Sequence, residues 1–123
     1  MPFEWDGFLV LAAELAERPG NEAAARSAVS RAYYATLGHA SEVLRGEGSI
    51  SLLRPHVDVP RALRNSAVVE RAAAGKGFNE LRQMRNRADY VSALDDDPAR
   101  LARDALELAR AVIHAVDHTP PAR

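Results

Sequence analysis

Apolar side chains recur at helical spacing along most of the chain. In five stretches they return every three or four positions, which places them on one face of an α-helix. The predicted helices cover about residues 5–16, 21–46, 58–72, 77–91 and 97–116. No stretch alternates apolar and polar residues as a half-buried β-strand would. Alanine, with 24 residues, strengthens the prediction of helix.

Turn and cap residues separate these helices. Pro19-Gly20 ends the first, and Asn21 is a suitable N-cap for the second. The other predicted boundaries are a loop over residues 46–58, a helix start at Asp58–Pro60, a break at Gly75–Gly77, and an N-cap followed by a first-turn proline at Asp97–Pro98.

This pattern predicts an all-α protein, an antiparallel bundle of four to five helices. The 123 residues fit one domain, expected over residues 1–118, with residues 119–123 as a flexible tail. No apolar run approaches the length of a membrane span, so we expect no membrane association. Acidic Glu4 and Asp6 stand where a secretory signal needs basic residues, and cysteine is absent. We therefore expect a cytoplasmic protein without disulfides or cysteine-bound zinc.

Charge is distributed unevenly although the chain's formal net charge is only −1. Residues 61–88 carry a net charge of +5, whereas residues 1–60 and 89–123 each carry −3. A basic segment between acidic flanks is a candidate surface for a polyanion. The same pattern is also typical of a solvated helix face, and charge alone does not decide between the two.

Two adjacent tyrosines lie in the second predicted helix, within the segment Ser30-Arg31-Ala32-Tyr33-Tyr34-Ala35. Neighbouring residues of a helix point about 100° apart, so at most one of the two rings faces squarely into the core. The other ring is expected at the rim, with a hydroxyl that needs a partner. Tyr34 is a candidate for RNA contact, although two packing aromatics remain an equally good interpretation.

The fourth predicted helix contains the segment Leu81-Arg82-Gln83-Met84-Arg85-Asn86-Arg87-Ala88-Asp89-Tyr90. Arg82, Arg85, Asn86 and Asp89 share one face at spacings of three and four residues. Arg85 also falls on the apolar stripe of this helix. A guanidinium there needs a buried partner, a cleft or an interface. An ion pair with Asp89, four residues on, is the simplest partner.

The two segments together resemble the small prokaryotic HEPN-domain proteins. The likeness rests on Ser-Arg-Ala-Tyr-Tyr-Ala, on Pro55-His56 in the predicted loop, and on Arg82-x-x-Arg85-Asn86-x-Ala88-Asp89-Tyr90, in this order between about residues 5 and 117. The resemblance implies a helical bundle that dimerises and places the closing motif in a shared cleft. Many HEPN proteins are metal-independent ribonucleases, often toxins paired with a nucleotidyltransferase-type antitoxin. Others bind RNA without cleaving it.

Active HEPN ribonucleases carry an arginine, often a polar residue next to it, and a histidine separated from the arginine by four to six residues. Arg85 and Asn86 match the first two, but Tyr90 stands where the histidine is expected, and no histidine lies between His56 and His114. A phenol with a pKa near 10 is a poor general base at neutral pH. Arg85, Asn86 and Tyr90 are therefore the catalytic candidates of a motif that lacks its histidine.

The resemblance thus implies a HEPN-type protein that binds RNA or a nucleotide as a homodimer, and we expect no metal or other cofactor. The predicted RNA-binding residues share one cleft; they are Tyr34, Arg82, Arg85, Asn86, Asp89 and Tyr90. Two alternatives remain open. One is an active metal-independent endoribonuclease toxin in which Tyr90 or another histidine, such as His56, replaces the motif histidine. The other is a non-catalytic module that binds a nucleotidyltransferase partner.

Overall fold

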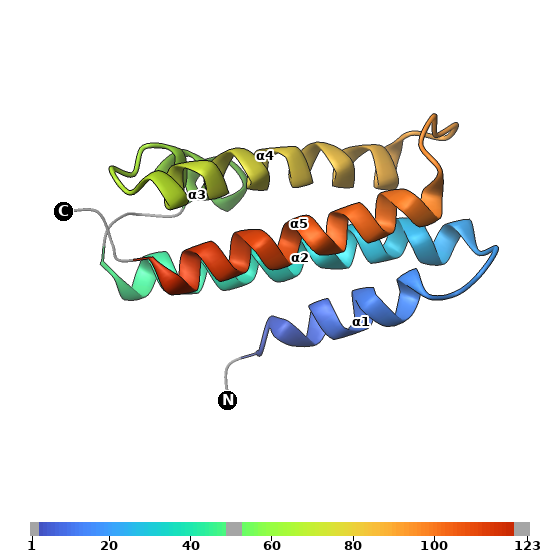
Figure 1. Ribbon diagram of the computed structural model, residues 1–123, viewed down its shortest axis with the longest axis horizontal. Helices are drawn as coiled ribbons and strands as arrows, with labels where there is room; N and C mark the ends of the chain where they lie inside the picture. Colours follow the sequence, from blue (N-terminus) through green and yellow to red (C-terminus); the bar gives the residue numbers. More distant parts are fainter. Residues whose placement is uncertain (1–2, 49–52, 120–123) are drawn as a thin grey trace.

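The computed structural model describes residues 3–48 and 53–119 and confirms an all-α bundle. Its helices are α1 (Asp6–Ala16), α2 (Glu22–Gly46), α3 (Pro55–Arg64), α4 (Val69–Tyr90) and α5 (Pro98–His118). The long helices α2 and α5 lie side by side in the middle, with α1 on one side and α3 and α4 on the other (Figure 1). None of the helices in the described ranges is both long and apolar enough to cross a membrane.

Helix α2 is the central element because it contacts every other helix. Its buried positions are mostly small, and alanines at the α2–α5 contact let the two backbones approach closely. Larger side chains fill the space around them, among them Tyr33, Phe78 and Leu81, all without solvent exposure. The side chain of Asn21 accepts a hydrogen bond from the Ala24 amide at 2.9 Å, as its predicted N-cap role requires.

The predicted limits of the third helix were wrong. Helix α3 begins at Pro55, inside the segment expected to be a loop, and ends at Arg64 rather than near residue 72. Asp58 was expected to mark the start of the helix; instead it lies in the first turn of a helix that begins at Pro55 and accepts a hydrogen bond from the Arg54 amide at 2.8 Å. Pro55 suits the first turn because its missing N–H would have no helical partner there. Residues 49–52 of the predicted loop lie outside the described residues.

The predicted helix break at Gly75–Gly77 was also wrong, since α4 runs through both glycines. A Cβ at Gly75 would lie 2.6 Å from the Arg64 backbone nitrogen, and one at Gly77 would lie 3.2 Å from Leu108 Cδ1. These glycines therefore allow α3 and α5 to pack closely against α4, and packing outweighs their weak helix propensity.

Arg71 of α4 holds the C-terminal end of α5 against the bundle through hydrogen bonds. Its guanidinium is almost fully buried and donates to both carboxylate oxygens of Glu47, at 2.7 and 2.6 Å. The hydrogen bonds to Glu47 raise the pKa of Arg71. Arg71 Nε also donates to Thr119 Oγ1 at 2.9 Å. Thr119, the first residue of the predicted tail, is thus held in place, while residues 120–123 lie outside the described residues.

Candidate functional site

The two adjacent tyrosines of α2 divide between core and rim as predicted. Tyr33 is buried without exposure, and Tyr34 is half-buried beside it with the two rings edge to face. The hydroxyl of Tyr34 accepts a hydrogen bond from Arg85 Nη2 at 2.7 Å. The half-exposed tyrosine of α2 therefore meets the arginine motif of α4 directly.

Arg85 is surrounded by aromatic rings, and its side chain is only 14% exposed. Its guanidinium carbon lies 5.6, 5.2 and 5.3 Å from the ring centroids of Tyr33, Tyr34 and Tyr90. Such cation–π contacts stabilise a partly desolvated guanidinium. Arg85 also donates to Asn86 Oδ1 at 3.1 Å and to the Tyr90 hydroxyl at 3.3 Å.

Asp89 orients this arginine. Its Oδ2 accepts from Arg85 Nε at 3.0 Å and from the Ser30 hydroxyl at 3.2 Å. The predicted ion pair between Arg85 and Asp89 is therefore present. With its Nε side held by Asp89, Arg85 turns its Nη2 edge toward the tyrosines.

His56 joins the site from α3, stacked on Tyr33. The two rings are nearly parallel, and the Tyr33 hydroxyl lies 2.6 Å from His56 Nδ1. Burial raises the pKa of Tyr33 to about 12, so its phenol stays protonated at neutral pH. Burial and the charges of Arg85 and Arg82 lower the pKa of His56, so its ring stays neutral.

We assign the Tyr33 hydroxyl as the donor of this hydrogen bond. A protonated phenol donates, and His56 Nδ1 is the acceptor that Tyr33 has among the described residues. The proton of a neutral imidazole then sits on Nε2. His56 therefore presents an N–H donor on its second nitrogen rather than a free lone pair.

Arg82 is held beside this histidine by the proline of α3. Pro60 has no N–H, so it leaves the His56 carbonyl four residues earlier without its helical donor. Arg82 Nη1 donates to that carbonyl at 3.1 Å. In the described part of the chain no carboxylate forms a salt bridge with Arg82.

Tyr33, Tyr34, His56, Arg82, Arg85 and Tyr90 are called the tyrosine–arginine cluster below. A row of alternating rings and guanidinium groups continues from it toward α1. Arg31 lies 5.4 Å from the ring centroid of Tyr34 and 4.8 Å from that of Phe8. The order across the surface is Phe8, Arg31, Tyr34, Arg85 and Tyr90, from three helices.

The predicted site residues thus meet at one place, and the structure adds three others. Tyr34, Arg85, Asn86, Asp89 and Tyr90 are linked by direct contacts. The sequence prediction named His56 only as an alternative, and it assigned no role to Arg31 or Phe8. Arg31 stands in the quoted tyrosine segment, so its place in that motif was a usable signal. Nothing in the sequence pointed to Phe8.

The basic segment 61–88 does not form one continuous surface. Arg71 is buried against Glu47, and Arg87 forms an ion pair with Asp96 at 3.2 Å on another face of α4. Arg61, Arg64 and Lys76 are exposed, but Arg82 and Arg85 are the cations of this segment that lie beside the tyrosines. In the described ranges no three histidine, aspartate or glutamate side chains are grouped as metal ligands would be.

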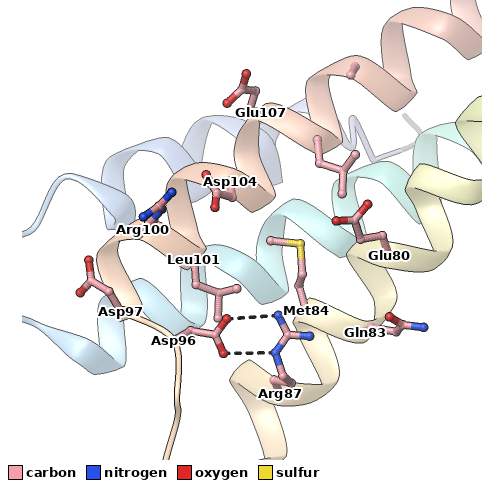
Figure 2. Close-up of a pocket in the computed structure, with 12 residues that line it drawn as sticks. Glu80, Gln83, Met84, Arg87, Asp96, Asp97, Arg100, Leu101, Asp104 and Glu107 are labelled. Atoms are coloured by element: carbon pink, nitrogen blue, oxygen red, sulfur yellow. Dashed lines mark hydrogen bonds and ion pairs between the residues drawn. The ribbon is translucent and has the colours of Figure 1, made fainter.

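A separate cavity, of about 820 Å³, lies between α4 and α5 and is called the acidic groove below. Met84, Leu101 and Leu108 are among its apolar lining residues. Figure 2 shows Arg87 and Asp96 joined at one end, with Glu80, Asp104 and Glu107 on the two flanking helices. Its α4 residues point away from the face that carries Arg82 and Arg85.

Comparison with protein-family models, curated proteins and solved structures found no match to this chain. What the chain does is therefore inferred from its residues and their geometry.

Proposed function

We propose that this chain is a HEPN-type protein that binds single-stranded RNA at the tyrosine–arginine cluster. The observation that carries the proposal is the row of alternating rings and guanidinium groups from Phe8 to Tyr90. Unpaired bases stack on aromatic rings and arginine planes, and arginines between them meet the phosphates. A row that alternates both groups matches the alternation of base and phosphate along a strand.

The charge balance of the row supports an anionic ligand. Arg31 and Arg82 have no salt bridge within the described residues, and only Asp89 pairs with Arg85 there. Arg82, the Nε2–H of His56 and the Tyr90 hydroxyl add donors around the same point. These groups favour a phosphate even though the whole chain is slightly acidic.

The chemistry of the cluster favours RNA binding without rapid RNA cleavage. A ribonuclease needs a group that removes the proton of the ribose 2′-OH near pH 7. The Tyr33 hydroxyl occupies Nδ1 of His56, which leaves the ring proton on Nε2, and Tyr90 is a phenol. We assign these groups to holding phosphate and Arg85 to orienting it. The metal-independent endoribonuclease remains the catalytic alternative, with Tyr90 as its base, or His56 in the other tautomer, whose proton is on Nδ1.

A homodimer completes the proposed site. Tyr90, whose hydroxyl accepts from the partly buried Arg85, is 72% exposed, and Val91 next to it in the chain is 41% exposed. Exposed apolar surface next to a polar site is typical of an interface. We propose a twofold-symmetric dimer in which the two α4 helices approach each other and bring both Arg85 sites into one cleft. The protein is proposed to act in the cytoplasm.

The acidic groove favours a second candidate function, that of a module for a partner protein. Apolar lining with acidic residues on both sides suits a partner segment that carries basic and apolar side chains. In the HEPN-type proposal this partner is a nucleotidyltransferase-type antitoxin. Binding of such a partner would be lost with Leu101→Glu and kept with Arg82→Ala.

Binding of a labelled single-stranded RNA of mixed sequence tests the RNA proposal. Arg82→Ala and Arg31→Ala should each weaken binding, because each removes a guanidinium without a salt bridge. Arg103→Ala, which removes an exposed arginine from α5, is the matched control and should bind as the wild type does. Equal binding by all four proteins, with unchanged helix content by circular dichroism, would refute the proposal.

A further inference from the structure

A small cavity borders the ring of Tyr34. It measures about 250 Å³, and Trp5, Tyr34, Leu37, Gly38 and Pro55 contribute to its walls. One water molecule takes about 30 Å³ of liquid volume, so the cavity has room for a planar heterocycle. Aromatic and apolar walls with a few polar groups are the usual lining of a small-molecule site.

Trp5 is fixed as one wall by two contacts with α2. A Cβ at Gly38 would collide with the indole, so the ring lies directly on the backbone of α2. The indole Nε1–H donates to Glu42 Oε1 at 3.1 Å. Both contacts hold the ring in one position before any ligand arrives, which lowers the entropic cost of stacking against it.

Two charged side chains of α2 also line the cavity. Glu42 and Arg45 are three residues apart on one helix face, and no ion pair joins them in the described part of the chain. A carboxylate accepts about four hydrogen bonds, so Glu42 retains capacity beyond the bond from Trp5. The cavity therefore offers a hydrogen-bond acceptor and a cationic donor side by side.

Guanine is the base that matches this pair. Its N1–H and 2-amino group are adjacent donors for a carboxylate, and its O6 and N7 are adjacent acceptors for an arginine. Adenine, cytosine and uracil each lack part of this arrangement. Resting on the proposed RNA binding, we infer that the Trp5–Tyr34 cavity receives a guanine base of a nucleotide whose phosphate meets Arg82 and Arg85.

Tyr34 connects the two parts of this proposed site. Its ring lines the cavity, and its hydroxyl accepts from Arg85 at 2.7 Å. The cavity and the Arg85 guanidinium are thus separated by the length of one tyrosine side chain. In the proposed complex a single nucleotide places its base in the cavity and its phosphate at the guanidinium, with Tyr34 beneath its sugar.

Trp5 is the only tryptophan of the chain, so its fluorescence reports directly on the cavity. The experiment titrates the wild type with GMP, AMP, CMP and UMP and repeats the titrations with Glu42→Gln and Arg82→Ala. GMP should quench the fluorescence at a concentration about tenfold lower than the other nucleotides, the discrimination expected for hydrogen bonds to a charged group. Glu42→Gln should weaken GMP binding about tenfold and leave UMP binding unchanged.

The two variants separate failure of the pocket from failure of the phosphate site. Equal quenching midpoints for the four nucleotides, or GMP binding unaffected by Glu42→Gln, would overturn the guanine pocket. If the guanine pocket failed in this way but Arg82→Ala weakened the binding of all four nucleotides equally, the proposed phosphate site would still be supported. A guanine preference that depends on Glu42 but not on Arg82 would support the pocket and refute the phosphate site.

Discussion

The phenol of Tyr33 donates its hydrogen bond to Nδ1 of His56, 2.6 Å away, and thereby determines what this histidine does. The bond joins the buried ring of α2 to the first turn of α3. It also leaves the His56 proton on Nε2, which can then only donate. A histidine in contact with the arginine motif is therefore not equivalent to the histidine that an active HEPN ribonuclease carries.

Protonation of His56 should destabilise the fold. Burial and the charges of Arg85 and Arg82 depress its pKa in the folded state, so the unfolded chain binds the proton more readily. The stabilisation is complete above the unfolded pKa of about 6.5 and is lost as the pH falls through the lower folded value. Urea unfolding of the wild type at pH 7.5 and 5.5 should show a larger loss of stability than that of His56→Gln. Equal losses would contradict the proposed state of His56.

Replacing Tyr90 by histidine should create ribonuclease activity. The Tyr90 hydroxyl already reaches Arg85 at 3.3 Å, and histidine there would give the spacing of Arg, four residues and His that active HEPN ribonucleases carry. General acid–base catalysis contributes about 10²–10⁴-fold to a rate. Tyr90→His should therefore cleave RNA in the presence of EDTA, and adding Arg85→Ala should remove the gain. Brisk EDTA-resistant cleavage by the wild type, abolished by Arg85→Ala, would instead establish the endoribonuclease alternative.

Gly75→Ala should destabilise the protein although alanine is the better helix former. Its Cβ would lie 2.6 Å from the Arg64 backbone nitrogen, and overpacking of this kind costs about 1–3 kcal/mol. Gly7→Ala is the control, because Gly7 lies in α1 and a methyl group there would meet open space. It should stabilise by up to about 1 kcal/mol. Chemical denaturation measures the free energy of unfolding of both variants. A Gly75→Ala protein more stable than the wild type would show that α3 and α4 are not closely packed.

Light scattering tests the proposed homodimer. At tens of micromolar the protein should have twice the chain mass of 13.4 kDa. Val91→Asp should shift it to the monomer, because a carboxylate would be buried in the proposed interface. A wild-type monomer would contradict the shared cleft.

The sequence was sufficient to predict what depends on local patterns. Helical periodicity placed α1, α2 and α5, and the spacing of Arg85 and Asp89 predicted their ion pair. Sequence-based prediction failed where tertiary contacts overrule local preference. Gly75 was predicted to break a helix, but it lies within α4 where α3 packs closely against it. His56 could not be assigned either, because only the fold brings α3 against Tyr33.

The salt dependence of RNA binding tests the central claim most directly. For single strands, the slope of log K against log salt concentration is about −0.7 for each phosphate that the protein neutralises. We expect a steep negative slope for the wild type, reduced in magnitude by about 0.7 in Arg82→Ala and by about 1.4 in Arg31→Ala/Arg82→Ala. Arg103→Ala should keep the wild-type slope. A slope that is the same in all of these proteins would contradict RNA binding at the tyrosine–arginine cluster.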